Sequence, residues 1–163
     1  MDAHAHAGAR HGADPSLNRL AFSATVHCLT GCAMGEVLGM VIGTALGWSN
    51  FRTIVLAIVL AFFFGYLLTM LPLLGAGLAL GAAIPLALAS DTISIAVMEV
   101  VDNAIMLLIP GALGAGLTDA LFWGSLAASL VIAGAVAFPV NRWLIARGKG
   151  HAVVHEHHHG HAS

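Results

Sequence analysis

Charged residues are scarce in this sequence: only 9% of its 163 residues are Asp, Glu, Lys or Arg. Lys and Arg together number six, and none of them lies in the interior of a hydrophobic run. A formal net charge of -2 without a basic cluster argues against nucleic acid as a partner. Because 59% of the residues are hydrophobic, the composition is typical of a membrane protein and not of a soluble domain.

Cysteine and recognisable catalytic motifs are also scarce. The two cysteines, Cys28 and Cys32, lie in one hydrophobic run and do not form the framework of a secreted disulfide-rich domain. The first twenty residues contain no apolar segment typical of a cleavable signal peptide, so we expect the membrane spans themselves to direct insertion. The glycine-rich stretch "LGAGLALG" lacks the lysine and the strand of a phosphate-binding loop. We therefore expect a protein that is not an enzyme.

Four hydrophobic runs are long enough to cross a bilayer, which needs about 20 apolar residues in a helix. They cover residues 21–48, 53–74, 90–110 and 117–143. The apolar segment 75–89 is glycine-rich and contains Pro85, so it is interpreted as a kinked or interfacial lead-in to the third span, or as part of one long helix over 78–109. The sequence predicts an all-α integral membrane protein, a bundle of four transmembrane helices over residues 19–148.

The termini share a composition and a predicted location. Residues 1–18 and 149–163 are rich in histidine and small residues, and both are predicted to be disordered. An even number of spans places both termini on one side. Basic residues flank the first and last spans: Arg10, Arg19, Arg142, Arg147 and Lys149. By the positive-inside bias, we expect cytoplasmic termini in a bacterial inner membrane.

Two patterns with a period of four residues run side by side in the first span. The first consists of Cys28, Cys32, Glu36 and Met40, which form one stripe on a helix because a helix advances about 100° per residue. The second consists of small residues, Gly31, Gly35, Gly39, Gly43 and Gly47. Because small residues at this spacing let another helix approach closely, the glycines predict a helix–helix interface that turns the stripe toward protein.

The stripe allows several interpretations. Cysteines four residues apart in an unbroken helix have Cβ atoms about 5–6 Å apart, which is too far for a disulfide but suits two ligands of one soft metal ion. Simple burial of two small apolar side chains is the alternative. His27 lies about 100° from the stripe, so it need not join the same site.

The third span carries a second polar face. Asp91, Met98, Glu99, Asp102 and Met106 fall on one side of the predicted helix. A carboxylate in the bilayer costs at least ~2.5–3.5 kcal/mol, and no span supplies a Lys or Arg partner. Glu36, Glu99 and Asp102 are therefore protonated and hydrogen-bonded between helices, line a hydrated cavity, or meet a cation.

These observations favour a transition-metal-binding membrane protein. Thiolates and thioethers favour copper(I), whereas the carboxylates and the histidine-rich tails also suit zinc or another divalent cation. The predicted metal ligands are His27, Cys28, Cys32, Glu36, Met40, Met98, Glu99, Asp102 and Met106. The alternatives are a membrane thiol oxidoreductase, a non-catalytic assembly subunit and a proton-coupled carrier. Four spans are few for a complete pathway, so a homo-oligomer in the lipid bilayer is expected.

The sequence also resembles a known family. Its hallmark is an H-C-x-x-G-C motif, present as His27, Cys28, Gly31 and Cys32, and the later segments "DTISIAVMEVVDN", "IPGA" and "FPVNRWLIARGKGHAVVH" are similar as well. The family consists of small four-helix membrane proteins and is classed as a domain of unknown function (family 4396). The resemblance covers about residues 20–155. It implies the fold but no particular activity.

Overall fold

A computed structural model describes residues 15–147, and this range is entirely helical apart from its connections. The described residues contain no strand, which confirms the predicted all-α fold. The histidine-rich tails predicted to be disordered lie outside the described residues. The elements are α1 (Pro15–Ala45), α2 (Asn50–Gly75), α3 (Leu80–Leu108), η1 (Ala112–Gly114) and α4 (Ala120–Ala146).

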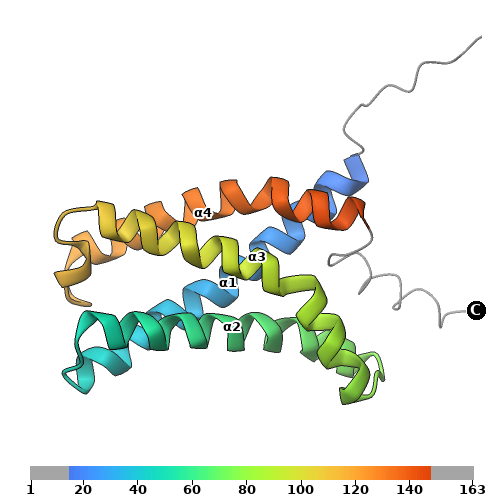
Figure 1. Cartoon of the computed structure of the whole chain (residues 1–163), viewed down its shortest axis with the longest axis horizontal. Coiled ribbons are helices and arrows are strands. Elements are labelled where there is room, and N and C mark those ends of the chain that lie inside the picture. Colours follow the sequence, from blue (N-terminus) through green and yellow to red (C-terminus); the bar gives the residue numbers. More distant parts are fainter. Residues whose placement is uncertain (1–14, 148–163) are drawn as a thin grey trace, which may run out of the picture.

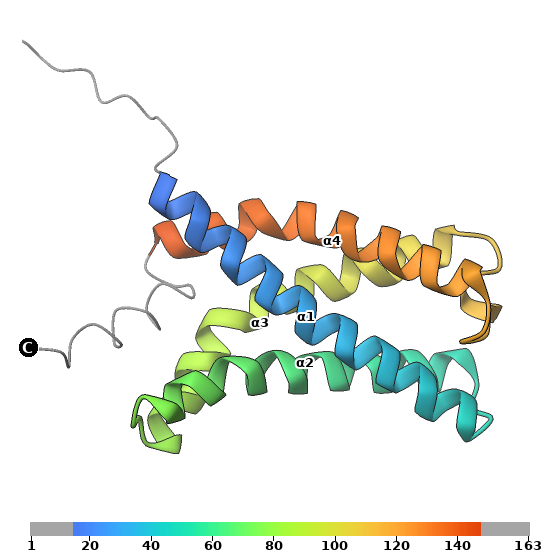
Figure 2. The same ribbon diagram turned by 180° about the vertical axis from the view of Figure 1, so that it is seen from behind.

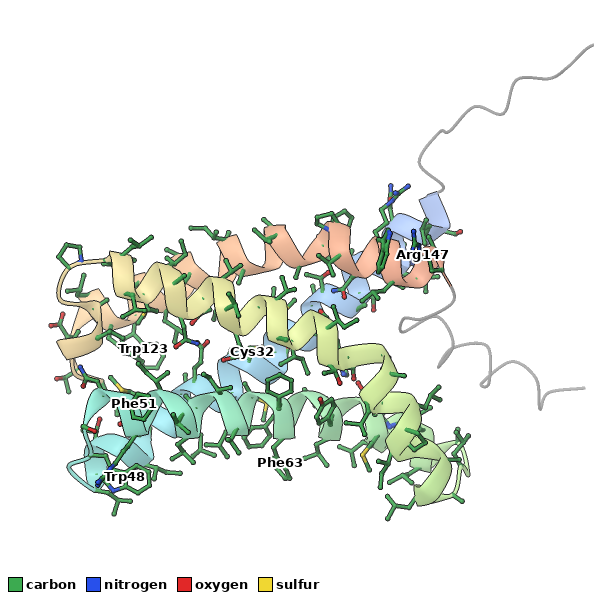
Figure 3. The ribbon with its side chains drawn as sticks, in the orientation of Figure 1. Cys32, Trp48, Phe51, Phe63, Trp123 and Arg147 are labelled. Carbon is green, nitrogen blue, oxygen red and sulfur yellow. The ribbon has the colours of Figure 1, made fainter. Side chains whose placement is uncertain are left out.

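Each of the four long helices is long and apolar enough to cross a membrane. Large apolar side chains point away from the bundle, among them Phe51 and Phe63 on α2 and Val131 on α4. Figure 3 shows Phe63 directed outward from the middle of α2. An apolar outer surface on helices whose backbone bonds are satisfied internally is what a lipid environment requires. The chain is a multi-pass membrane protein.

The first and third helices cross between the second and fourth (Figures 1 and 2). The start of α1 lies beside the end of α4, where Ala21, Ala24 and Ile145 form a small core. The rest of α1 runs diagonally to α2. In turn, α3 begins beside the end of α2 and finishes near the start of α4. Thus α1 and α3 approach each other at mid-bundle and diverge toward both ends.

Four glycines make the contact between α1 and α2, and we call them the glycine ridge: Gly31, Gly35, Gly39 and Gly43. A Cβ built on Gly31 would lie 2.7 Å from the Cα of Gly65, and one on Gly39 would lie 2.7 Å from the Cα of Ala57. Such distances leave no room for a side chain, so the predicted packing role of Gly31, Gly35, Gly39 and Gly43 is confirmed. The ridge fixes the rotation of α1 and turns its neighbouring stripe toward α3.

The prediction that Gly47 belongs to this ridge is wrong. Helix α1 ends at Ala45, and Gly47 has a φ of 62° in the turn that follows, with nothing within 4 Å of a built Cβ. Its amide donates to the Thr44 carbonyl, and the Trp48 amide donates to the Gly43 carbonyl. This is a helix C-terminus closed by a left-handed glycine, so Gly47 has the right spacing but a different role.

The segment before the third span is mostly helical. Helix α3 begins at Leu80 and continues through Pro85 to Leu108, which confirms the long-helix alternative. Its first part bends away from the rest of the helix (Figure 1). Pro85 removes one backbone hydrogen bond within the segment, a known cause of helix bending. The bend lets the start of α3 follow α2 while its remainder crosses the bundle.

Both ends of the described chain lie at one end of the bundle, together with the α2–α3 turn (Figure 1). The loops between α1 and α2 and between α3 and α4 lie at the opposite end, which we call the loop end. Trp48 and Trp123 mark the loop end, and Arg147 marks the other (Figure 3). The Arg147 guanidinium stacks 4.2 Å above the Trp143 ring. Indole rings at both ends of the bundle are typical of the aromatic belts at membrane interfaces.

Candidate functional site

Three sulfur-containing side chains meet where α1 and α3 cross. Cys28 and Cys32 from α1 and Met98 from α3 belong to one core cluster, together with small residues of α2 and α4. Both cysteines are free thiols, and their exposed fractions are only 2% and 1%. Figure 3 places Cys32 in the middle of the bundle. We call Cys28, Cys32 and Met98 the sulfur cluster.

Polar side chains of α3 lie against this cluster. Cys28 interacts with Ser94, and Cys32 interacts with Glu99. Glu99 is buried, and its Oε1 has no hydrogen-bond partner. The Asn103 amide donates to the Glu99 backbone carbonyl at 2.9 Å and reaches its Oε2 at 3.5 Å. The sulfur cluster is therefore bordered by a buried carboxyl group with unused acceptor capacity.

The remaining members of both polar faces line a cavity at the loop end. Its volume is about 390 Å³, and its lining includes Glu36, Met40, Asp102 and Met106. The cavity lies where α1 and α3 have diverged, and residues of both loops form its rim. We call it the vestibule. Its position beyond the sulfur cluster follows from the order of residues along both helices.

His27 belongs to a separate polar network on the other side of the crossing. Its Nε2 is 2.9 Å from the Thr69 hydroxyl on α2. The Thr69 hydroxyl donates to the Asp91 carboxylate, and the Ser90 hydroxyl donates to the other oxygen of that carboxylate at 2.9 Å. Because these groups are buried or partly buried, the network links α1, α2 and α3 by bonds that water does not replace.

The nine predicted metal ligands are thus divided among three places. His27 lies in the network with Asp91. Four ligands lie in or beside the sulfur cluster: Cys28, Cys32, Met98 and Glu99. The other four line the vestibule: Glu36, Met40, Asp102 and Met106. Nowhere in residues 15–147 do three or more His, Cys, Asp or Glu side chains lie close enough together to hold a metal ion. A single centre that uses all nine residues is therefore not formed, because α1 and α3 touch only at mid-bundle.

One buried polar residue, Asn141, was not predicted as part of any site. Asn141 of α4 donates to the Thr25 hydroxyl at 2.9 Å, and Thr25 donates to the Ala21 carbonyl. The sequence signal for Asn141 was weak, because the residues three and four positions before it are apolar.

Comparison with known proteins supplies the family. A family model described as Domain of unknown function (DUF4396) matches residues 18–150. The chain belongs to this family. The match covers the four-helix bundle and confirms the family resemblance seen in the HCxxGC motif of Cys28 and Cys32. No curated protein and no solved structure matches the chain.

Proposed function

We propose that this DUF4396 protein binds a soft transition-metal cation, copper(I), within the membrane and hands it across the bundle. The observation that carries the proposal is the sulfur cluster, in which two free thiols and one thioether from crossing helices are buried together. Copper(I) accepts two or three sulfur ligands, and its preference for thiolate and thioether exceeds that of harder divalent ions. A site with Cys28, Cys32 and Met98 supplies that set.

The surrounding charges support a cation at this place. Metal binding requires the thiols to lose their protons, and nearby carboxyl groups can receive them. Glu99 adjoins Cys32, and Glu36 lies one helical turn farther toward the vestibule. The vestibule then provides a route between the sulfur cluster and the loop end, with Met40 and Met106 as further thioethers along its wall.

Basic residues at one end of the bundle indicate its orientation in a membrane. We place the protein in a bacterial inner membrane with cytoplasmic termini, since Arg19, Arg142 and Arg147 lie at the end of the bundle where the described chain begins and ends. The histidine-rich tails would then collect metal ions from the cytoplasm. Four membrane-spanning helices are few for a complete transport pathway, which favours a homo-oligomer. Binding and transfer need no chemical conversion, so the protein is proposed not to be an enzyme.

The test is copper binding by full-length protein purified without a metal-affinity column. Samples are loaded with copper(I) in the presence of a competing copper(I) chelator, which keeps weak histidine sites empty, and the bound metal is measured by elemental analysis. Wild type is expected to retain about one copper per chain, and Cys28→Ser or Cys32→Ser to lose most of it. Thr30→Ser, an exposed position on the same helix, is the matched control.

Several outcomes would contradict the proposal. Copper retention that neither cysteine substitution lowers would exclude the sulfur cluster as the site. Retention of zinc but not copper(I), lost on substitution of the carboxyl groups, would support the divalent-cation alternative. A Cys28–Cys32 disulfide that forms and breaks reversibly would support a thiol oxidoreductase. Normal folding without any bound metal would leave an assembly role.

A further inference from the structure

The vestibule has the size and lining of a small-molecule site. Its volume of about 390 Å³ falls within the range of ligand pockets, about 300–1,000 Å³. It is formed by four elements, since α1, α2, α3 and α4 all contribute residues, and the loop after α3 closes part of the rim. Most of its wall is apolar, including Trp48, Ile54, Phe122 and Leu126.

Two carboxyl groups lie at its inner end. Glu36 is 9% exposed, and neither of its side-chain oxygens has a hydrogen-bond partner. Asp102 interacts with Glu36 from α3, and its Oδ1 also has no hydrogen-bond partner. Buried carboxylates are stable only when they are paired or neutralised. No Lys or Arg is among the described residues that line the cavity, so none of them supplies a positive charge there.

The buried acids and the apolar wall of the vestibule together indicate which kind of ligand fits it. A bare metal ion would contact the carboxyl groups but would leave most of the volume and the apolar wall unused. A neutral apolar molecule would pack against the apolar wall but would leave Glu36 and Asp102 without a counter-charge. An organic cation satisfies both parts, because its ammonium group meets the acids while its hydrocarbon part packs on Trp48 and Phe122.

We propose that the vestibule binds a small organic amine in its protonated form. The ammonium group lies between Glu36 and Asp102, and the apolar part points toward the rim. This site does not use Cys28, Cys32 or Met98, so it does not rest on the proposed copper function. In this proposal, Glu36 of α1 and Asp102 of α3 bind a ligand that enters the vestibule from the loop end of the bundle.

The experiment compares two probes that differ mainly in charge. Full-length protein in detergent, stripped of metal by a chelator, is titrated with 2-phenylethylamine and with its neutral analogue 2-phenylethanol, and binding is followed by calorimetry. The amine is expected to bind saturably and roughly tenfold or more tightly than the alcohol, since only the amine forms charge-assisted hydrogen bonds. Equal affinity for the two probes, or no binding of the amine, would overturn the proposal.

Variants then locate the site. Glu36→Gln and Asp102→Asn are each expected to weaken amine binding roughly tenfold or more, whereas Glu36→Asp, which keeps the carboxyl group, is expected to bind. Glu99→Gln changes a buried acid outside the vestibule lining and is expected to have no effect. Cys28→Ser is also expected to bind amine normally, which separates this result from that of the copper test. Loss of amine binding in Glu99→Gln, or its persistence in Glu36→Gln, would contradict the assignment.

Discussion

Gly35 of α1 and Ala61 of α2 are in backbone contact, because a Cβ built on Gly35 would lie 2.2 Å from the Ala61 amide nitrogen. No rotamer change relieves such a contact, since both partners are backbone. The two helices can accommodate a larger residue only by moving apart, and α1 would then carry the stripe with Cys32 and Glu36 away from its present position.

Gly35→Ala is therefore expected to destabilise the bundle. Overpacking at a closely packed position costs about 1–3 kcal/mol. Unfolding by denaturing detergent, followed by circular dichroism, measures the change. The matched control is Gly124→Ala in α4, where a built Cβ meets nothing within 4 Å and the substitution is expected to be neutral or slightly stabilising. Equal effects at both positions would show that Gly35 has no packing role.

The network around Thr69 predicts a loss of stability in Thr69→Val. This change keeps the shape of the side chain but removes the hydroxyl that donates to Asp91 and lies 2.9 Å from His27. Leaving buried partners unsatisfied costs about 1–3 kcal/mol. Thr92→Val removes an exposed hydroxyl on α3 and is the control. If both substitutions change the unfolding free energy equally, the network contributes nothing specific.

The thiols are expected to resist modification in the folded protein. Cys28 and Cys32 are almost completely buried, and their spacing in the unbroken helix α1 does not favour a disulfide. A bulky maleimide should label neither residue until denaturing detergent is added, whereas an introduced Ser49→Cys in the α1–α2 loop should react at once. Rapid labelling of the native cysteines would show that the centre of the bundle opens in solution.

The sulfur cluster predicts that two methionines differ in their effect on copper(I). Met98→Leu removes the thioether of the sulfur cluster and is expected to weaken copper(I) binding roughly tenfold. Met34→Leu changes an exposed methionine on α1 and is expected to leave affinity unchanged. Affinities come from competition with a copper(I) chelator. An equal loss of copper(I) affinity in both variants would mean that Met98 is not a ligand and that both substitutions act by lowering the stability of the protein.

The orientation in the membrane can be tested by labelling from one side. In cells that carry Cys28→Ser and Cys32→Ser, a membrane-impermeant maleimide is expected to label Ser49→Cys without permeabilisation, because the loop end is predicted to face outward. Arg147→Cys, at the opposite end of the bundle, is expected to react only after permeabilisation. The reverse pattern would place the termini outside the cytoplasm.

The sequence predicted the faces of helices better than it predicted their partners. The four-residue spacing placed the glycines and the stripe of Cys32 and Glu36 correctly on α1, since helical periodicity depends only on local geometry. It could not show that the glycines pack on α2, because spacing says nothing about which helix approaches a given face. The predicted packing role of Gly47 is wrong because α1 ends before this residue.

The vestibule could not be predicted for a related reason. It exists because α1 and α3 diverge beyond their crossing, and that crossing depends on the glycine contacts and on the bend near Pro85. Glu36 and Asp102 were identified as residues in need of a counter-charge, but their shared cavity depends on four elements far apart in the sequence. The separate placement of His27 agrees with its angle from the stripe.

The distance between the vestibule and the sulfur cluster has an electrical consequence. From Met40 to Cys28 the path along α1 is ~18 Å at ~1.5 Å per residue, which is roughly half of a hydrocarbon core of ~30 Å. A cation that moves over this distance therefore crosses about half of the membrane voltage. Since a full crossing of one charge corresponds to ~2.3 kcal/mol per 100 mV, occupancy of the inner site would shift by ~1 kcal/mol per 100 mV. The energised state of the cell would then bias which of the two sites is filled.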